Sequence, residues 1–202
     1  MAKRAIDEQL LFDAALEEFS RHSFEEASIN KIIADARITK GSFYYRFSTK
    51  YDLYIYLLKE SARRKWQFID ENVKPDQKPG AGKDIFDFFR IQAESGARFA
   101  EAYPKYHQLS KMFSREKSSP LYKKAMKDLE TVDESGLSQL IKVSYESGNF
   151  KKEYSPEFID KLIKGLFFAF DDILFKNEDF ELDKCMEYLR QFTDFMKFGL
   201  KA

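Results

Sequence analysis

The sequence predicts an all-α protein of about nine helices, because apolar residues recur with helical spacing along most of its 202 residues. Only eight glycines and five prolines are available for turns, which is too few for an all-β chain. The 44% of hydrophobic and 34% of charged residues are typical of a soluble protein with a sizeable core. The length fits either one large domain or a small domain joined to a larger one.

Composition disfavours several classes of protein. A single cysteine excludes an internal disulfide framework, and the sequence has no CxxC or HxxxH pair, so we expect neither a metal site nor a cofactor. The first ten residues include acidic side chains and no long apolar core, which argues against a signal peptide. No stretch approaches the length of a membrane span, so we expect no membrane partner and a location in the cytoplasm.

The first two helices are expected close to the N-terminus. One runs from about Arg4 to His22, with an apolar face made of Leu11, Phe12, Ala15, Leu16 and Phe19. After a break, Ser28 is placed to cap a short second helix over residues 29–36. Ile32 and Ile33 of that helix should face inward.

Seven further helices complete the expected order. Thr39 is placed to cap a very short third helix over residues 40–47, and Ser48 or Thr49 caps a fourth that runs toward Ile69. Residues 73–84 contain two prolines and two glycines and form the clearest linker. Beyond the linker, helices are expected at about 83–102, 104–113, 120–147, 155–176 and 182–200.

Positive charge is concentrated between Ser28 and Lys50, where five Lys and Arg residues accompany one acidic residue in a chain of zero net charge. A solvated helical face is one interpretation, because many surface helices carry such charge. Two short helices joined by a turn, the second opening with hydroxyl and small residues, are instead typical of a helix-turn-helix that enters the major groove of DNA. Since a local basic patch also suits a polyanion, we interpret the segment as a DNA-binding unit.

Residues 13–58, DAALEEFSRHSFEEASINKIIADARITKGSFYYRFSTKYDLYIYLL, resemble the DNA-binding region of TetR-type transcriptional repressors. The resemblance covers roughly the first 60 residues, and the rest of the chain is similar to the family only in length and helical layout. It implies a three-helix DNA-binding domain over residues 1–50. Through the fourth helix this domain would join a larger effector-binding and dimerisation domain over residues 51–202.

The resemblance also implies roles for individual residues. Contacts with DNA phosphates are implied for Ser28, Thr39, Tyr44 and Lys50, and also for Arg46, which could instead contact a base. Lys50 would meet its phosphate at the N-terminus of the fourth helix, where the helix dipole favours an anion. The residues implied to face the floor of the groove are Lys40, Gly41, Ser42 and Tyr45. Among these, Lys40 can donate to guanine and Gly41 allows close approach of the backbone, whereas the tyrosines also have a packing interpretation.

Two positions depart from the family pattern. Family members generally carry glycine after the first helix and in the turn before the third, where this chain has Ser23 and Arg37. A left-handed backbone at either position would cost roughly 1 kcal/mol with a side chain present. Arg37 is expected to add a further phosphate contact.

The 21 phenylalanines and 11 tyrosines indicate an unusually aromatic interior, interface or pocket. The last two expected helices are apolar on two sides, so both sides need to be covered. In the TetR family such helices pair with their symmetry mates as a four-helix dimer interface. The interface residues implied here are Phe168, Phe175, Tyr188, Phe195 and Phe198. Cys185 is expected to be a small buried residue.

The resemblance also implies an effector pocket in the larger domain, lined by aromatic residues. The candidate lining residues are Trp66, Phe89, Phe99, Tyr103, Tyr106, His107, Met112, Phe113, Tyr145 and Phe167. Each of them is also what an ordinary core contains. His107 is the candidate for polar recognition, with a surface histidine as the alternative, and the expected ligand is apolar or aromatic.

The expected function is that of a homodimeric repressor that binds double-stranded DNA at a palindromic operator. Binding of a small effector would shift the protein to a state with lower affinity for DNA. The alternative is a helix-turn-helix protein that is controlled by a protein partner or has no effector. An enzyme is disfavoured, because no motif links His22 or His107 to a nucleophile, a metal or a carboxylate pair.

Overall fold

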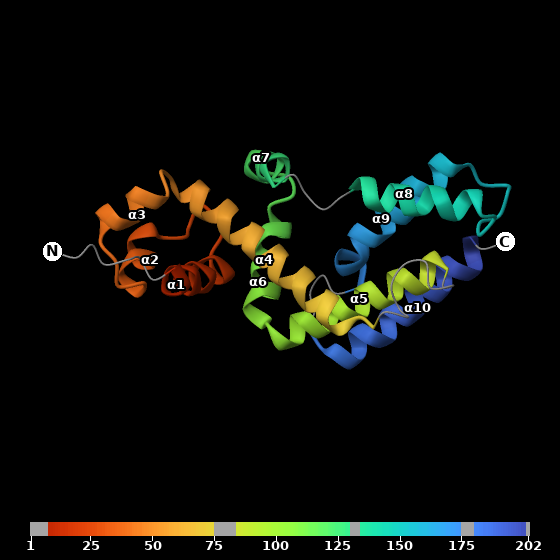
Figure 1. Cartoon of the computed structure of the whole chain (residues 1–202), viewed down its shortest axis with the longest axis horizontal. Coiled ribbons are helices and arrows are strands. Elements are labelled where there is room, and N and C mark those ends of the chain that lie inside the picture. Colours follow the sequence, from red (N-terminus) through yellow and green to blue (C-terminus); the bar gives the residue numbers. More distant parts are fainter. Residues whose placement is uncertain (1–7, 75–83, 130–133, 175–179, 201–202) are drawn as a thin grey trace. The chain divides into compact units, whose positions relative to one another are not determined.

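The computed structural model describes residues 8–74, 84–129, 134–174 and 180–200, which form ten α-helices and no strand (Figure 1). The prediction of an all-α fold is confirmed. The first five helices are α1 (Glu8–Arg21), α2 (Ile29–Asp35), α3 (Lys40–Arg46), α4 (Lys50–Asn72) and α5 (Ile85–Ala102). The others are α6 (Pro104–Arg115), α7 (Pro120–Asp128), α8 (Glu134–Glu146), α9 (Pro156–Leu174) and α10 (Leu182–Leu200). Residues 75–83, most of the expected linker, lie outside the described residues.

The helix expected over residues 120–147 forms two helices in the described residues, which accounts for the difference from about nine. The first of them, α7, begins where Ser119 accepts a hydrogen bond from the Tyr122 N–H at 3.0 Å, with a proline at the first helical position. It ends at Asp128, and α8 begins at Glu134. The sequence between these helices has neither glycine nor proline, so it gave no stop signal.

The chain folds as two compact units. Unit 1 combines Met1–Gln67 with Ala102–Thr131, and unit 2 combines Phe68–Glu101 with Val132–Ala202. The helices α6 and α7 therefore belong to the same unit as the expected helix-turn-helix, although they follow it by many residues. These compact units differ from the expected division into a DNA-binding domain (residues 1–50) and an effector-binding and dimerisation domain (residues 51–202), which stays a prediction.

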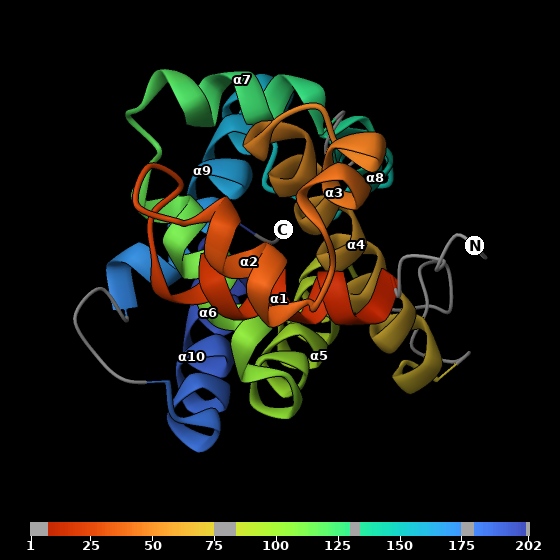
Figure 2. The same cartoon turned by 90° about the vertical axis from the view of Figure 1, so that its left-hand side faces the viewer.

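Unit 1 is held together by α1, which packs against α2 and α6. Figure 2 views this unit from the side of α2 and α3. The ring of Phe19 lies 4.8 Å from that of Tyr54, and Phe12 lies 6.1 Å from Tyr106 of α6. Ile32, Ile33, Phe43 and Phe47 are buried, as expected for the small core of the helix-turn-helix.

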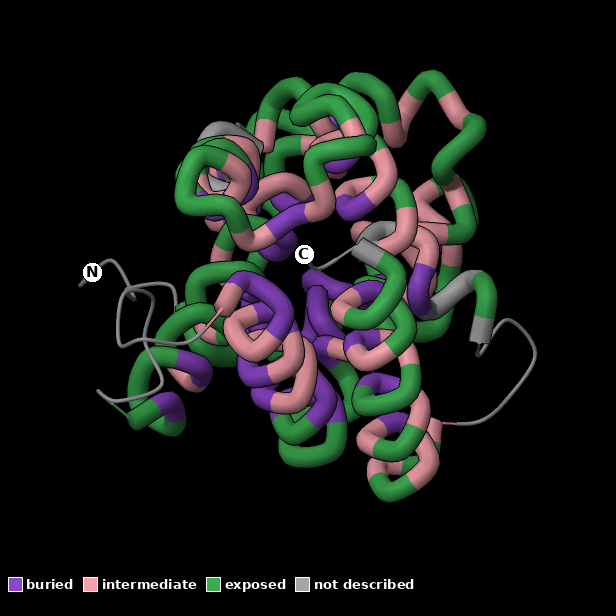
Figure 3. The backbone as a smooth tube through the Cα atoms, turned by 90° about the vertical axis from the view of Figure 1, so that its right-hand side faces the viewer, coloured by how far each residue is buried: buried purple, intermediate pink, exposed green. Residues whose placement is uncertain are grey.

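Unit 2 has an aromatic core. One cluster of buried residues is made of Ile85, Phe86, Phe89, Ile141, Phe150, Ile159, Ile163 and Met196. A second contains Ala97, Phe170, Cys185 and Leu189, and so confirms the expectation of a buried Cys185. Buried and exposed stretches alternate along the helices (Figure 3), as expected for amphipathic helices that each cover part of a core.

Candidate nucleic-acid interface

The two short helices of unit 1 each begin at the predicted cap. The Ser28 hydroxyl accepts a hydrogen bond from the Lys31 N–H at 3.3 Å at the start of α2. The Thr39 hydroxyl accepts one from the Ser42 N–H at 3.0 Å at the start of α3. Because each helix has only seven residues, these caps satisfy a large share of its free N–H groups.

The first turn of α3 is open to solvent. Lys40 and Gly41 are exposed, and a Cβ placed on Gly41 would meet only the Thr39 hydroxyl oxygen, at 3.9 Å. Packing within the protein therefore does not require glycine here. Glycine at this position would matter to a partner that approaches the backbone closely.

Two aromatic side chains extend from the same short helix. Tyr44 is 56% exposed and Tyr45 is 78% exposed, whereas Phe43 between them and the core is fully buried. The ring of Tyr44 packs edge-on against Phe43 at 5.1 Å. The packing interpretation therefore applies to one face of Tyr44, and most of both tyrosine side chains is available to a partner.

Thr39 and Ser42 form a hydroxyl pair at the start of α3, with their oxygens 2.9 Å apart. Thr39 also serves as the helix cap, so its oxygen already accepts the Ser42 N–H. Any contact of Thr39 with a phosphate must therefore use its remaining hydrogen-bonding capacity. Arg37, which precedes this pair in the turn, is exposed and has a left-handed backbone, with φ at 54°.

Arg46 lies at the end of α3 and is bound within the protein. Its guanidinium pairs with the Glu8 carboxylate and lies 5.5 Å from the ring centres of both Phe47 and Tyr56. The hydrogen bond from Arg46 keeps the pKa of Glu8 below its usual value. A phosphate contact by Arg46 would have to compete with this pair.

Lys50 is also directed inward. Its ammonium donates hydrogen bonds of 3.1 Å to the carbonyl oxygens of Glu25 and Ala27, and lies 4.7 Å from the centre of the Phe24 ring. The helix that it begins is capped by Thr49, which exchanges backbone and side-chain hydrogen bonds with Asp52 at 2.9 and 3.1 Å. Lys50 thus ties the start of α4 to the loop before α2.

Two acidic residues, which the sequence pattern does not predict, hold this region together. Glu18 is 3% exposed, accepts the Ser28 N–H at 2.9 Å and lies 3.4 Å from the Lys31 ammonium. Glu116, which follows α6, accepts the Phe24 N–H at 3.0 Å. Glu18 falls within the apolar stripe of α1, which could have drawn attention to it, whereas no local pattern distinguishes Glu116.

The residues expected to line an effector pocket are divided between the two units. Trp66, Tyr103, Tyr106, His107, Met112 and Phe113 belong to unit 1, and Phe89, Phe99 and Tyr145 belong to unit 2. The ring centres of Phe113 and Tyr122 are 4.6 Å apart, and those of Phe99 and Phe68 are 5.5 Å apart. The Tyr145 hydroxyl donates to the Tyr154 carbonyl oxygen at 3.0 Å. Phe167 lies in α9, and its side chain is outside the described part of the chain.

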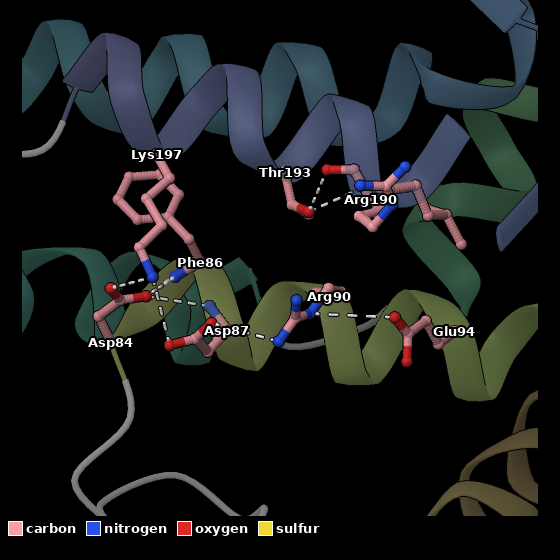
Figure 4. A network of polar contacts seen from close by, with 9 residues as sticks. Asp84, Phe86, Asp87, Arg90, Glu94, Arg190, Thr193 and Lys197 are labelled. Atoms are coloured by element: carbon pink, nitrogen blue, oxygen red, sulfur yellow. Dashed lines mark hydrogen bonds and ion pairs between the residues drawn. The ribbon is translucent and has the colours of Figure 1, made fainter. Parts of the chain in front are cut away.

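A polar network in unit 2 joins α10 to the start of α5 (Figure 4). The Lys197 ammonium lies 3.0 Å from an oxygen of Asp84, whose other oxygen accepts the backbone N–H groups of Phe86 and Asp87. The hydrogen bond to Asp84 raises the pKa of Lys197. None of the expected effector residues lines the small recess beside this network, so the network explains the packing of α5 and not a binding site.

The expected dimer residues that the structure describes lie on α10. Phe195 and Phe198 are 70% and 76% exposed, and Tyr188 is half-buried beside Lys184. Since Phe195 and Phe198 are three residues apart on one helix, they form one apolar surface. The side chain of Phe168 and the whole of Phe175 fall outside the described residues.

Two further properties follow from the described part of the chain alone. It contains no group of three His, Cys, Asp or Glu side chains that could hold a metal ion. None of its helices combines the length and the apolar character needed to cross a membrane.

Comparison with known proteins identifies the N-terminal part. Residues 11–57 match the family model of bacterial regulatory proteins of the tetR family. The chain carries the N-terminal domain of the TetR family. This match includes the whole of α2 and α3 and the first part of α4, which are the helices whose geometry is described above. No curated protein matches the chain by sequence.

The TetR fold extends over the rest of the chain. A TetR-family regulator from Chloroflexus aurantiacus superposes with a TM-score of 0.71 at 21% identity, covering 96% of this chain and 93% of the other. A putative regulator of the family from Syntrophomonas wolfei gives 0.67 at 22% identity over 95% and 94%. The fatty acid degradation regulator FadR from Bacillus halodurans gives 0.67 at 18% identity over 96% of both chains. These likenesses show that the whole chain has the fold of the regulators named, and the family model identifies its N-terminal domain.

Proposed function

We propose that the chain is a homodimeric repressor that binds a palindromic operator in double-stranded DNA and leaves it when a small apolar or aromatic effector binds. The observation that carries the proposal is the open first turn of α3. This turn presents Lys40 and the backbone at Gly41, and the next turn of the same helix adds the exposed Tyr44 and Tyr45, all within the part of the chain that matches the TetR family model. A helix of this kind reads bases with its N-terminal residues when it enters the major groove.

The residues of α3 divide by the contact that each can make. Lys40 is exposed and can donate to guanine, while Gly41 lets the backbone approach the bases. Thr39 and Ser28 have hydroxyl groups at helix N-termini, and Tyr44 has an exposed hydroxyl-bearing side chain in the second turn of α3, so all three suit phosphate oxygens. Phosphate contacts fix the position of the helix, so the choice of sequence rests on Lys40, Gly41, Ser42 and Tyr45.

Dimer formation is supported by the exposed aromatic surface of α10. Phe195 and Phe198 would be covered by the same surface of a second copy, as in a two-fold symmetric interface. Two copies would then present two α3 helices to a palindromic site, which matches the symmetry of the protein.

Effector control is supported by the aromatic core of unit 2. Phe86, Phe89 and Phe150 are buried there, with Tyr145 packed against them, so an apolar or aromatic molecule would find compatible neighbours. The effector acts only to the extent that it binds the DNA-free state more tightly than the DNA-bound state.

Selection of bound duplexes from a random-sequence library tests the proposal, because it requires no assumption about the operator sequence. The expected result is an inverted repeat whose half-sites lie about one helical turn, or a multiple of it, apart. Recovery of sequences without any common motif would contradict operator binding. A thermal-shift screen of apolar ligands, followed by DNA binding with each ligand that raises the melting temperature, then tests effector control.

A further inference from the structure

A cluster of lysines on α7 has no role in the function described so far. Lys123, Lys124 and Lys127 are all exposed on this helix. Lys127 follows Lys124 by three residues and Lys123 by four, so the three ammonium groups share one helix face. Like charges at this spacing repel one another by a few tenths of a kcal/mol, and a bound anion would relieve that repulsion.

Two acidic residues near α7 in the described part of the chain, Asp128 and Glu116, accept hydrogen bonds from other groups of unit 1. Asp128 accepts a hydrogen bond from the Tyr51 hydroxyl at 2.7 Å, and Glu116 accepts the Phe24 N–H at 3.0 Å. Partial burial and the hydrogen bond to Asp128 raise the pKa of the Tyr51 hydroxyl. Lys123 and Lys127 have no ion-pair partner among the described residues, in contrast to Lys31 and Arg63, which pair with acidic residues of their own helices.

The position of α7 relates these lysines to the expected DNA-binding surface. The Lys124 ammonium lies 3.8 Å from the centre of the Tyr51 ring, and Tyr51 is the second residue of α4. Figure 2 shows α7 along one edge of the unit that carries α2 and α3. The helix is fixed there by Ala125, which is fully buried, and by the contact of Tyr122 with Phe113.

The start of α4 is where a phosphate contact is expected, but the cation that the family pattern supplies there is directed inward. Lys50 donates to the carbonyl oxygens of Glu25 and Ala27 and covers the ring of Phe24. Within the part of the chain that the structure describes, Lys123 and Lys127 are neighbouring cations without such partners. Helix dipole and lysine charge would act together on an anion at this place.

We propose that Lys123, Lys124 and Lys127 form an accessory DNA contact that binds phosphates flanking the part of the groove read by α3. This inference rests on the proposed function and adds a second, sequence-independent surface to it. An acidic protein segment has charge of the same sign, but the packing of α7 on the first turn of α4 favours DNA. Each lysine that meets a phosphate contributes to the salt dependence of binding.

The test compares two variants that each lose two positive charges. In Lys123→Gln/Lys127→Gln the charges are removed from α7, while Lys124 keeps its contact with Tyr51. In Lys142→Gln/Lys152→Gln they are removed from exposed positions of unit 2. Binding to a fluorescent random-sequence duplex longer than about three helical turns is measured by anisotropy over a series of salt concentrations. Melting temperatures check that both variants are folded.

The α7 variant is expected to bind with a salt slope lower by about two than that of the unchanged protein, and the unit 2 variant with an unchanged slope. Equal slopes for all three proteins would overturn the accessory contact, and an acidic protein would then be the better candidate for α7. Lys40→Ala separates this failure from failure of the proposed function. If Lys40→Ala weakens binding while the α7 variant does not, only the accessory contact is wrong, and if the unchanged protein binds no DNA, the proposed function fails too.

Discussion

The ammonium of Lys50 lies 3.1 Å from the carbonyl oxygen of Ala27, the residue that precedes the cap of α2. A second hydrogen bond of the same length reaches the carbonyl oxygen of Glu25. Lys50 therefore links the first residue of α4 to the loop that begins the helix-turn-helix. Its removal is expected to affect the orientation of α2 as well as any contact with DNA.

Lys50→Ala is expected to lower the free energy of unfolding by about 1–2 kcal/mol, because two charge-assisted hydrogen bonds are lost at a partly exposed site. Lys59→Ala, on the exposed face of the same helix, is the matched control and should change it little. Urea denaturation measures both. If Lys50 also meets a phosphate, the salt slope of DNA binding falls by about one, and a slope equal to that of the unchanged protein would assign Lys50 to structure alone.

Arg37→Gly is expected to raise the free energy of unfolding by up to about 1 kcal/mol, because Arg37 has a left-handed backbone that glycine adopts without strain. Ser23→Gly should have the opposite effect. Ser23 has no positive φ, and its hydroxyl donates to Glu26 at 2.7 Å while its N–H donates to the same carboxylate at 3.2 Å. The melting temperatures of both variants test these expectations. A higher melting temperature for Ser23→Gly would contradict a stabilising role for the hydrogen bonds between Ser23 and Glu26.

Gly41→Ala is expected to separate folding from DNA binding. A Cβ there meets no atom closer than 3.9 Å, and alanine favours the helix by about 0.5–1 kcal/mol over glycine, so the free protein should be slightly more stable. On DNA the added methyl group would occupy the space through which the backbone approaches the bases. Undiminished affinity for the selected operator would remove Gly41 from the recognition surface.

The ion pair between Glu17 and Lys105 predicts a dependence on pH. Lys105 lies 2.6 Å from a Glu17 oxygen and keeps the pKa of Glu17 below its ordinary value of 4.5. Since the folded protein has the lower pKa, the stabilisation is fully present above the ordinary value and is lost as the pH falls through the folded value. The pair is partly exposed, so Glu17→Gln should cost only about 0.5 kcal/mol at neutral pH and progressively less in acid.

A control for this prediction removes the partner instead of the acid. In a Lys105→Met background, the pH dependence of the Glu17→Gln effect should shrink but not vanish, because Arg21 still pairs with the other Glu17 oxygen at 2.5 Å. Urea unfolding at several pH values measures the four proteins of the cycle. A pH dependence of the same size with and without Lys105 would contradict the assigned cause.

Local features of this fold could be predicted from sequence, and long-range contacts could not. The caps Ser28 and Thr39 are recognised by a side chain and the helix that directly follows it. The partner of Arg46 is Glu8, 38 residues away, and that of Phe24 is Glu116, 92 residues away, so no periodicity reveals them. For the same reason, apolar spacing identified aromatic residues such as Tyr106 and Phe89 but not the unit that each belongs to.

The turn before α3 also shows that a backbone conformation could not be predicted from residue type. The sequence drew attention to Ser23 and Arg37 together, since the family pattern carries glycine at both positions. Only Arg37 has the left-handed backbone, because the turn between α2 and α3 is tight, whereas Ser23 shares a capping arrangement with Glu26. Residue type alone does not decide which backbone conformation the surrounding helices impose.

The central claim is that α3 reads DNA through Lys40, and the most direct test is the affinity of Lys40→Ala for the selected operator and for random-sequence DNA. The account predicts a loss on the operator that exceeds the loss on random DNA by about 1–3 kcal/mol, because a base contact is removed as well as a charge. Equal losses on the two duplexes would show that Lys40 contributes only charge, and would contradict base recognition by this residue.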